Sequence, residues 1–166
     1  MALVRVFCVD HSSLLRAVGS GDEKLVVAVV DRHARAVARS EGGPVSPDPA
    51  VRRAVGALVD GAWGAVSDEA VRFGLQLLCE AIGEPLDVGP FGHALDLDGA
   101  KAATLPRPWN TRLRALGDAG VPGLPIEGAR VGHLSHRDLR GRAPNATVAA
   151  WAARVGDAEI LVGFSG

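Results

Sequence analysis

Only two segments of this 166-residue chain have the pattern of a well-formed strand, and they lie near its opposite ends. Residues 4–9 are apolar except for Arg5 and rich in β-branched side chains, which predicts a strand covered on both faces. Residues 159–164 predict a second strand. Since two strands cannot form a stable sheet by themselves, helices must cover them and supply most of the core. The sequence therefore predicts a mostly helical α+β fold with a small sheet formed by the N-terminal and C-terminal strands.

The segment after Gly19 predicts the first long helix. Ser20, with Glu23 three residues later, forms a capping box that starts this helix. Apolar side chains and one histidine then keep helical spacing: Val26, Val29, Val30, His33 and Val37. A histidine on such a stripe is more typical of a core side chain than of a ligand. Residues 41–49 contain two glycines and three prolines, which predicts a loop, and residues 50–60 predict a further helix.

Residues 67–83 predict the central helix of the fold. Ser67 is the expected N-cap and Gly83 the expected end. One stripe of this helix is apolar, and two further side chains widen it: Val71, Gly74, Leu75, Leu78 and Ile82, with Phe73 and Leu77 beside them. A helix that is apolar over so much of its circumference is typical of the buried centre of a domain.

The second half of the chain gives weaker signals. Glycines and prolines interrupt residues 84–109 and predict irregular structure. A helical face then begins at Trp109, and a last helix is predicted from Asn145 to Gly156, which ends it.

Length and composition predict a single globular domain spanning residues 1–166. At this length, and with 48% hydrophobic residues, about 68–70% of the unfolded surface can be buried. The loop at 41–49 does not separate domains, because neither flank could bury its apolar face alone. The 18 basic and 19 acidic residues are spread along the chain, so neither nucleic acid nor an anionic membrane is an expected partner.

Cys8 and Cys79 each lie within an apolar run, which is typical of a small core side chain rather than of a nucleophile. The first residues lack the pattern of a secretory leader, and no segment has the ~18 uninterrupted apolar residues of a membrane span. These features predict a cytoplasmic protein without a membrane anchor.

His133, His136 and Asp138 are metal-ligand types at close spacing. A zinc or iron site needs a third or fourth ligand and partners that orient the rings, and no HExxH pattern is present. Ser135, with Asp138 three residues later, is instead typical of a loop that turns into a helix capped by Ser135. We therefore predict no metal site and no cofactor.

Asp10 and His11 follow the N-terminal strand, at a position where folds with sheets often carry functional groups. Adjacent side chains cannot form a catalytic triad, but such a pair could act as acid and base. The competing interpretation is that Asp10 caps the following helix. The run GSGDEK at residues 19–24 lacks the pattern of a phosphate-binding loop, so nucleotide binding is not expected.

Several short motifs along the chain carry a family resemblance. They are the opening strand with Asp10, the run VGSGDE at residues 18–23, Phe73-Gly74 with Leu77-Leu78-Cys79 and Gly83, Trp109, Gly132 with Leu134, and the closing Trp151 and Phe164. Together they span nearly the whole chain and resemble a family of small uncharacterised proteins frequent in actinobacteria. The resemblance implies a shared fold and a cytoplasmic bacterial setting, without a reaction. His11, His93, His133 and His136 do not belong to the family pattern, which points to a specialised task in this member.

Our first functional hypothesis is a cytoplasmic accessory or interaction domain. It would bind a partner protein or a small ligand in a groove near the middle segment, with Trp109 and Phe73 as the ligand-binding residues.

The alternative hypothesis is a small cofactor-independent enzyme of bacterial specialised metabolism. It would use Asp10, His11, His93 and His133 for proton transfer in a pocket beside Trp109. A pocket of about 300 Å³ or more lined by at least two of these groups favours the enzyme. Solvated histidines and an exposed apolar patch favour the binding domain.

Overall fold

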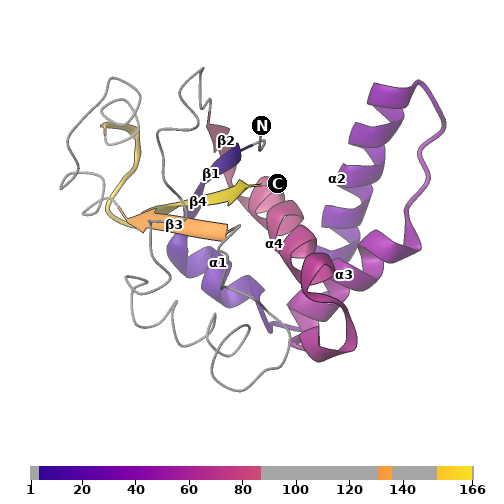
Figure 1. Cartoon of the computed structure of the whole chain (residues 1–166), viewed down its shortest axis with the longest axis horizontal. Helices are drawn as coiled ribbons and strands as arrows, with labels where there is room; N and C mark the ends of the chain where they lie inside the picture. The colour runs from indigo at the N-terminus through magenta and orange to yellow at the C-terminus, as the bar shows by residue number, and fades with distance from the viewer. Residues whose placement is uncertain (1–3, 87–130, 136–152, 166) are drawn as a thin grey trace.

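The computed structural model describes residues 4–86, 131–135 and 153–165 of the chain (Figure 1). Its elements, in chain order, are β1 (Val4–Asp10), α1 (His11–Ala17), α2 (Glu23–Glu41), α3 (Pro49–Asp60), the 3-10 turn η1 (Trp63–Ala65), α4 (Asp68–Ile82), β2 (Glu84–Leu86), β3 (Val131–Ser135) and β4 (Glu159–Ser165). The fold is a mostly helical α+β fold, as the sequence predicts.

The sheet has the order β2-β1-β4-β3, and every neighbouring pair is antiparallel. Its centre is the pairing of the two end segments of the chain, which runs in unbroken register from Val4 opposite Ser165 to Asp10 opposite Glu159. The prediction of a sheet built from the N-terminal and C-terminal strands is therefore confirmed. The two short strands β2 and β3 extend this pair on either side.

Strand β1 is buried on both faces, as its composition predicts. Phe7 and Val9 belong to the same hydrophobic cluster as Phe164 of β4, and the Phe7 and Phe164 rings meet edge to face at 6.0 Å between centroids. The alternate side chains Val6 and Cys8 are also buried, at 3% and 5% exposure. Because successive side chains of a strand point to opposite faces, neither face of β1 is left to solvent between Val6 and Val9.

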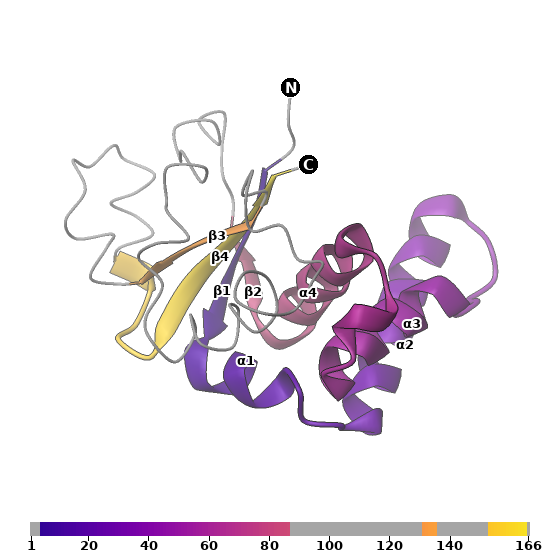
Figure 2. The ribbon, with the colours of Figure 1, turned by 60° about the horizontal axis from the view of Figure 1, so that its bottom comes forward.

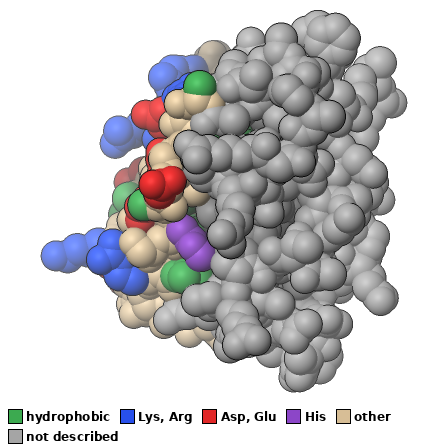
Figure 3. Space-filling model, turned by 90° about the vertical axis from the view of Figure 1, so that its left-hand side faces the viewer, with side chains coloured by type: hydrophobic (Ala, Val, Ile, Leu, Met, Phe, Trp, Pro, Cys, Tyr) green, Lys and Arg blue, Asp and Glu red, His purple; other side chains and the backbone are tan. Residues whose placement is uncertain are grey.

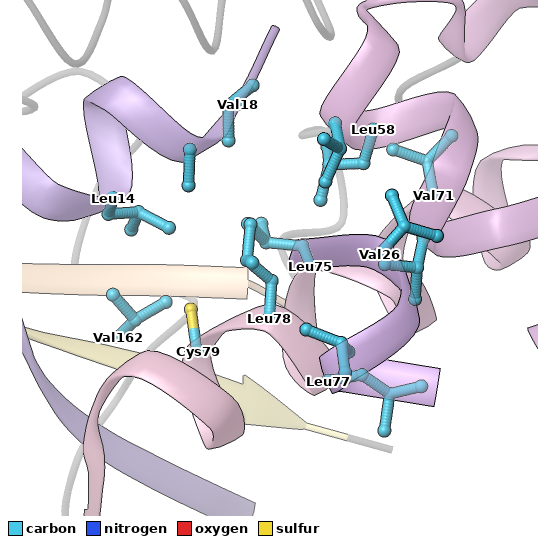
Figure 4. Packing of buried hydrophobic residues seen from close by; sticks show 14 of the residues in the cluster. Leu14, Val18, Val26, Leu58, Val71, Leu75, Leu77, Leu78, Cys79 and Val162 are labelled. Atoms are coloured by element: carbon cyan, nitrogen blue, oxygen red, sulfur yellow. The ribbon is translucent and has the colours of Figure 1, made fainter. Parts of the chain in front are cut away.

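The helices lie on one side of the sheet in successive layers (Figures 1 and 2). α1 and α4 contact β1, α3 packs on α4, and α2 packs on α3 and α4. Side chains from α1, α2, α3, α4 and β4 meet in one cluster, which Figure 4 shows at close range. Among the described helices, none combines the length and the apolar composition that crossing a membrane requires.

Most helix starts follow from local signals in the sequence. Asp10 caps α1 by accepting a hydrogen bond from the Ser13 amide at 2.8 Å, and Ser67 caps α4 through the Ala70 amide at 3.2 Å, so both predicted caps are confirmed. The predicted Ser20 cap of α2 is wrong. Asp22 caps that helix, while the Ser20 hydroxyl donates to the carbonyl of Ala17 and closes the preceding turn.

Residues 131–135 correct the expectation of a loop leading into a helix. They form β3, in which Val131 lies opposite Phe164 and Ser135 opposite Ile160. The physical reason lies in the edge of β4 that faces away from β1, where backbone amides and carbonyls need hydrogen-bond partners. Residues 131–135 supply these partners, so they form a strand whatever their own strand propensity. The helix predicted after Ser135 and most of the one predicted from Asn145 lie outside the described residues.

A close contact between α3 and α4 depends on a glycine in the middle of α4. A Cβ atom added to Gly74 would lie 2.9 Å from the carbonyl oxygen of Ala54 in α3 and 3.0 Å from its carbonyl carbon. Both neighbours are backbone atoms, which cannot rotate away. Gly74 therefore sets how closely α3 and α4 approach.

This close approach predicts opposite effects for two glycine-to-alanine changes. Gly56 lies inside α3 with no atom within 4 Å of an added Cβ, so Gly56→Ala should stabilise the fold by about 0.5–1 kcal/mol through helix propensity. Gly74→Ala gains the same propensity but forces the two helices apart, which costs about 1–3 kcal/mol. Urea unfolding of both variants checks this. A stabilised Gly74→Ala protein would contradict the packing described here.

Candidate functional site

A groove of about 1220 Å³ lies between α2 and α4. The strand β1 contributes Arg5 to it, and the loop that follows α2 contributes Gly43 and Val45. We call this feature the α2–α4 groove. Asp10 and His11, the two predicted acid–base residues whose side chains the structure describes, do not line it.

Three of the four large hydrophobic side chains that are exposed in the described part of the chain line the α2–α4 groove. Four large hydrophobic side chains are exposed among the described residues: Val27 (40%), Val37 (37%), Val45 (56%) and Phe73 (37%). All but Val27 line the groove. Single exposed hydrophobic side chains are ordinary, but their concentration in one groove is typical of an interaction site.

The groove exists because α2 extends beyond α3 and α4, the helices that pack against it. Its buried residues are Val26, Val29, Val30 and Ala34, and none of residues 35–41 is buried. Figures 1 and 2 both show the C-terminal half of α2 reaching beyond α3 and α4. The apolar spacing that predicts this helix nevertheless continues to Val37. One face of the helix is therefore apolar over a length that no described element covers.

Phe73, predicted as a ligand-binding residue, stands on α4 at the groove. Its ring meets the ring of His33 on α2 edge to face, with 5.7 Å between centroids and 86° between the ring planes. Such an aromatic pair contributes about 0.5–1.5 kcal/mol beyond its buried area, so it holds the Phe73 side chain in place. His33 is half-buried and serves packing here, while the ligand-binding role of Phe73 stays a prediction.

The polar part of the groove is dominated by arginine. Four arginines line it against two acids: Arg5, Arg32, Arg35 and Arg39, with Asp31 and Glu80. None of these guanidinium groups forms an ion pair within the described part of the chain, whereas Arg52 and Arg154 each pair with a glutamate. On the face of the molecule in Figure 3, by contrast, the described acidic and basic side chains are interspersed.

Three of these arginines share one side of α2, because residues spaced by three and four positions are neighbours on a helix surface. Arg32, Arg35 and Arg39 have this spacing. This stripe is not among the predicted site residues, although its spacing is visible in the sequence. What the sequence does not show is that α4 and the loop after α2 turn this side into the wall of a groove.

Asp10 and His11 have structural partners at the end of β1. The Oδ1 atom of Asp10 accepts hydrogen bonds from the Ser13 amide at 2.8 Å and from the Ser12 hydroxyl at 2.9 Å. Hydrogen bonds from Ser13 and Ser12 lower the pKa of Asp10 and keep it ionised. The His11 amide donates to the carbonyl of Ala158 at 2.9 Å, and burial lowers the pKa of the half-buried imidazole.

Strand pairing places the backbone of His133 apart from Asp10 and His11. β3 places His133 opposite Val162, and β1 places Phe7 opposite Val162, so His133 lies two strands away from Phe7. At about 3.3 Å per residue and about 4.8 Å between strands, the Cα atoms of His133 and Asp10 are roughly 14 Å apart. His93 and Trp109 lie outside the described residues. The acid–base hypothesis therefore stays a prediction.

Both cysteines are buried and protonated at neutral pH. Burial, together with a hydrogen bond to Glu159, raises the pKa of Cys8 to about 12, and its Sγ atom donates to Glu159 Oε2 at 3.1 Å. Burial alone raises the pKa of Cys79. The expectation that both are core side chains is confirmed. Within the described ranges, no cluster of three or more histidine, cysteine, aspartate or glutamate side chains could hold a metal ion.

Comparison with known proteins gives no match: no family model, no curated protein and no solved structure is detectably similar to this chain. The resemblance to the actinobacterial family therefore stays a prediction. The function is therefore inferred from the geometry of the α2–α4 groove and from its side chains.

The buried position of His11 predicts a loss of stability in mild acid. Its pKa in the folded state lies below the ordinary value of 6.5, so as the pH falls below about 6.5 the unfolded chain binds a proton before the folded one. The contribution of His11 to stability is therefore complete above pH 6.5 and declines below it. Urea midpoints measured at about pH 7 and pH 5 should fall more steeply for the native sequence than for His11→Gln. Parallel slopes would contradict this placement of His11.

Proposed function

We propose that this chain is an interaction domain that binds a partner protein in the α2–α4 groove. The observation that carries the proposal is the gathering of Val37, Val45 and Phe73 in one groove beside the uncovered half of α2. A chain that leaves these side chains in water forgoes the free energy of burying them, about 1.5–3 kcal/mol for each one fully buried. A partner that covers the groove recovers part of that free energy on binding.

The size of the groove favours a protein segment over a small molecule. Pockets for small ligands measure about 300–1,000 Å³ and enclose most of the ligand surface. The α2–α4 groove, at about 1220 Å³, is larger than that range, and exposed side chains line it. The balance of 18 basic and 19 acidic residues over the chain argues against nucleic acid as the partner.

The cytoplasmic setting belongs to the same proposal. It is supported by two buried cysteines that form no disulfide, which is the usual state of cysteine in a reducing compartment. A partner protein present in the same compartment is therefore expected to carry the complementary surface.

Site-specific crosslinking tests the proposed function. The photoreactive analogue p-benzoylphenylalanine replaces Phe73 in one variant of the full chain and Val27 in a second, since Val27 is equally exposed but lies outside the groove. In cells that encode the protein, light should attach a specific protein to position 73 and not to position 27. With that protein purified, Phe73→Ala should weaken binding at least about tenfold, which is about 1.4 kcal/mol, because buried aromatic anchors dominate such interfaces.

The matched control is Val27→Ala, which should change the dissociation constant less than about twofold. Equal adducts from both positions, or a folded Phe73→Ala protein with unchanged affinity, would contradict the proposal. A small molecule that copurifies in the groove without any protein adduct would contradict it as well.

A further inference from the structure

The charges around the α2–α4 groove restrict the chemistry of its occupant. Arg5, Arg32, Arg35 and Arg39 line the groove without an ion pair to any described residue, against only Asp31 and Glu80. A partner that covers the groove removes water from these guanidinium groups. Burying a charge is costly unless an opposite charge replaces the lost hydration, and a carboxylate matches the guanidinium fork best.

We propose that the segment filling the α2–α4 groove is an acidic amphipathic helix of a partner protein. This inference rests on the proposed function and specifies the partner. The apolar side of that helix packs on Val37, Val45 and Phe73, and its aspartates and glutamates lie opposite the stripe of Arg32, Arg35 and Arg39.

The walls of the groove favour a helix over an extended segment. They are formed by α2 and α4, whose backbone amides and carbonyls bond within each helix. An extended peptide gains its affinity by adding a strand to a sheet edge. Among the described residues, the sheet contributes only Arg5 to this groove. An amphipathic helix needs no backbone partner and buries side chains spaced at i, i+3, i+4 and i+7.

A second copy of this chain is a poor occupant of the groove. An α2 helix from a second copy would bring its own Arg32, Arg35 and Arg39 against the same three residues. Like charges placed together in an interface cost several kcal/mol and act against the wrong partner. The charge pattern therefore indicates a heterologous partner.

The experiment uses random 16-residue peptides displayed on phage and selected on the full chain. The enriched peptides should be rich in aspartate and glutamate and should carry apolar residues at helical spacing. Their affinity, measured by fluorescence anisotropy, should fall at least tenfold for the double variant Arg35→Glu/Arg39→Glu. Raising the salt from about 0.15 M to about 0.5 M should weaken binding in the same direction.

Matched controls separate charge at the groove from charge elsewhere. Arg53 is exposed on α3 and does not line the α2–α4 groove, so Arg53→Glu should change affinity less than twofold. A peptide with lysine at its acidic positions should bind the double variant at least tenfold more tightly than it binds the native chain. Circular dichroism of each variant verifies the fold, which these exposed substitutions should leave intact.

The outcomes distinguish this inference from the proposed function. Selected peptides whose binding is weakened by Phe73→Ala but not by Arg35→Glu/Arg39→Glu would contradict the acidic helix and leave the groove as a binding site. Peptides that depend on Phe73 but are neutral, basic or without helical spacing would have the same meaning. Selection that yields no peptide dependent on Phe73 overturns both.

Discussion

The pairing of β1 with β4 is the constraint on which the rest of this structure depends. It joins two segments about 150 residues apart in the chain, in a register that runs from Val4 opposite Ser165 to Asp10 opposite Glu159. The paired strands provide the surface on which α4 packs. The end of α4 lies very close to β1, since a Cβ atom on Gly83 would lie 2.6 Å from the carbonyl oxygen of Cys8. α3 and α2 are in turn positioned by their contacts with α4 and with each other.

The position of α2 in this stack explains the groove. α3 approaches α4 closely at Gly74, and α2 packs against both of these helices from outside. Burial along α2 ends at Ala34, while the helix continues to Glu41. The uncovered half is capped as a regular helix end, with Gly42 in the left-handed conformation at a φ of 71°. The chain thus builds a helix surface that no described element covers, and the arginines along it form no ion pair within the described part of the chain.

The sequence predicts the elements whose signals are local. The β-branched end segments, the caps Asp10 and Ser67 and the broad apolar stripe of α4 all follow from residue types and spacing. Residue types alone do not fix the start of α2, because Ser20 and Asp22 both offer capping oxygens two residues apart and only the conformation of the turn decides between them. β3 does not follow from its own residues, because Gly132 has low strand propensity and the pairing with β4 is a property of the sheet rather than of the segment.

The groove could be predicted only in part. The sequence indicates Phe73 as a side chain beyond the main stripe of α4, and the helical spacing of Arg32, Arg35 and Arg39 can be read directly. The position at which α2 stops being covered by other helices depends on the lengths and packing angles of α3 and α4. No local sequence pattern encodes these. Asp10 and His11 are close to each other only because they are consecutive in the chain. The pairing of the strands places His133 apart from both of them.

Hydrogen exchange along α2 tests most directly whether the chain leaves half of this helix uncovered. Residues 35–41 have no buried side chain, so their amides should exchange through local opening and much faster than those of Val29, Val30 and Ala34, whose protection should approach that of the buried core. The predicted result is a step in protection close to Ala34 in the isolated protein. Uniform protection from Val29 to the end of α2 would show that the chain itself covers this surface, and it would contradict a binding role for the α2–α4 groove.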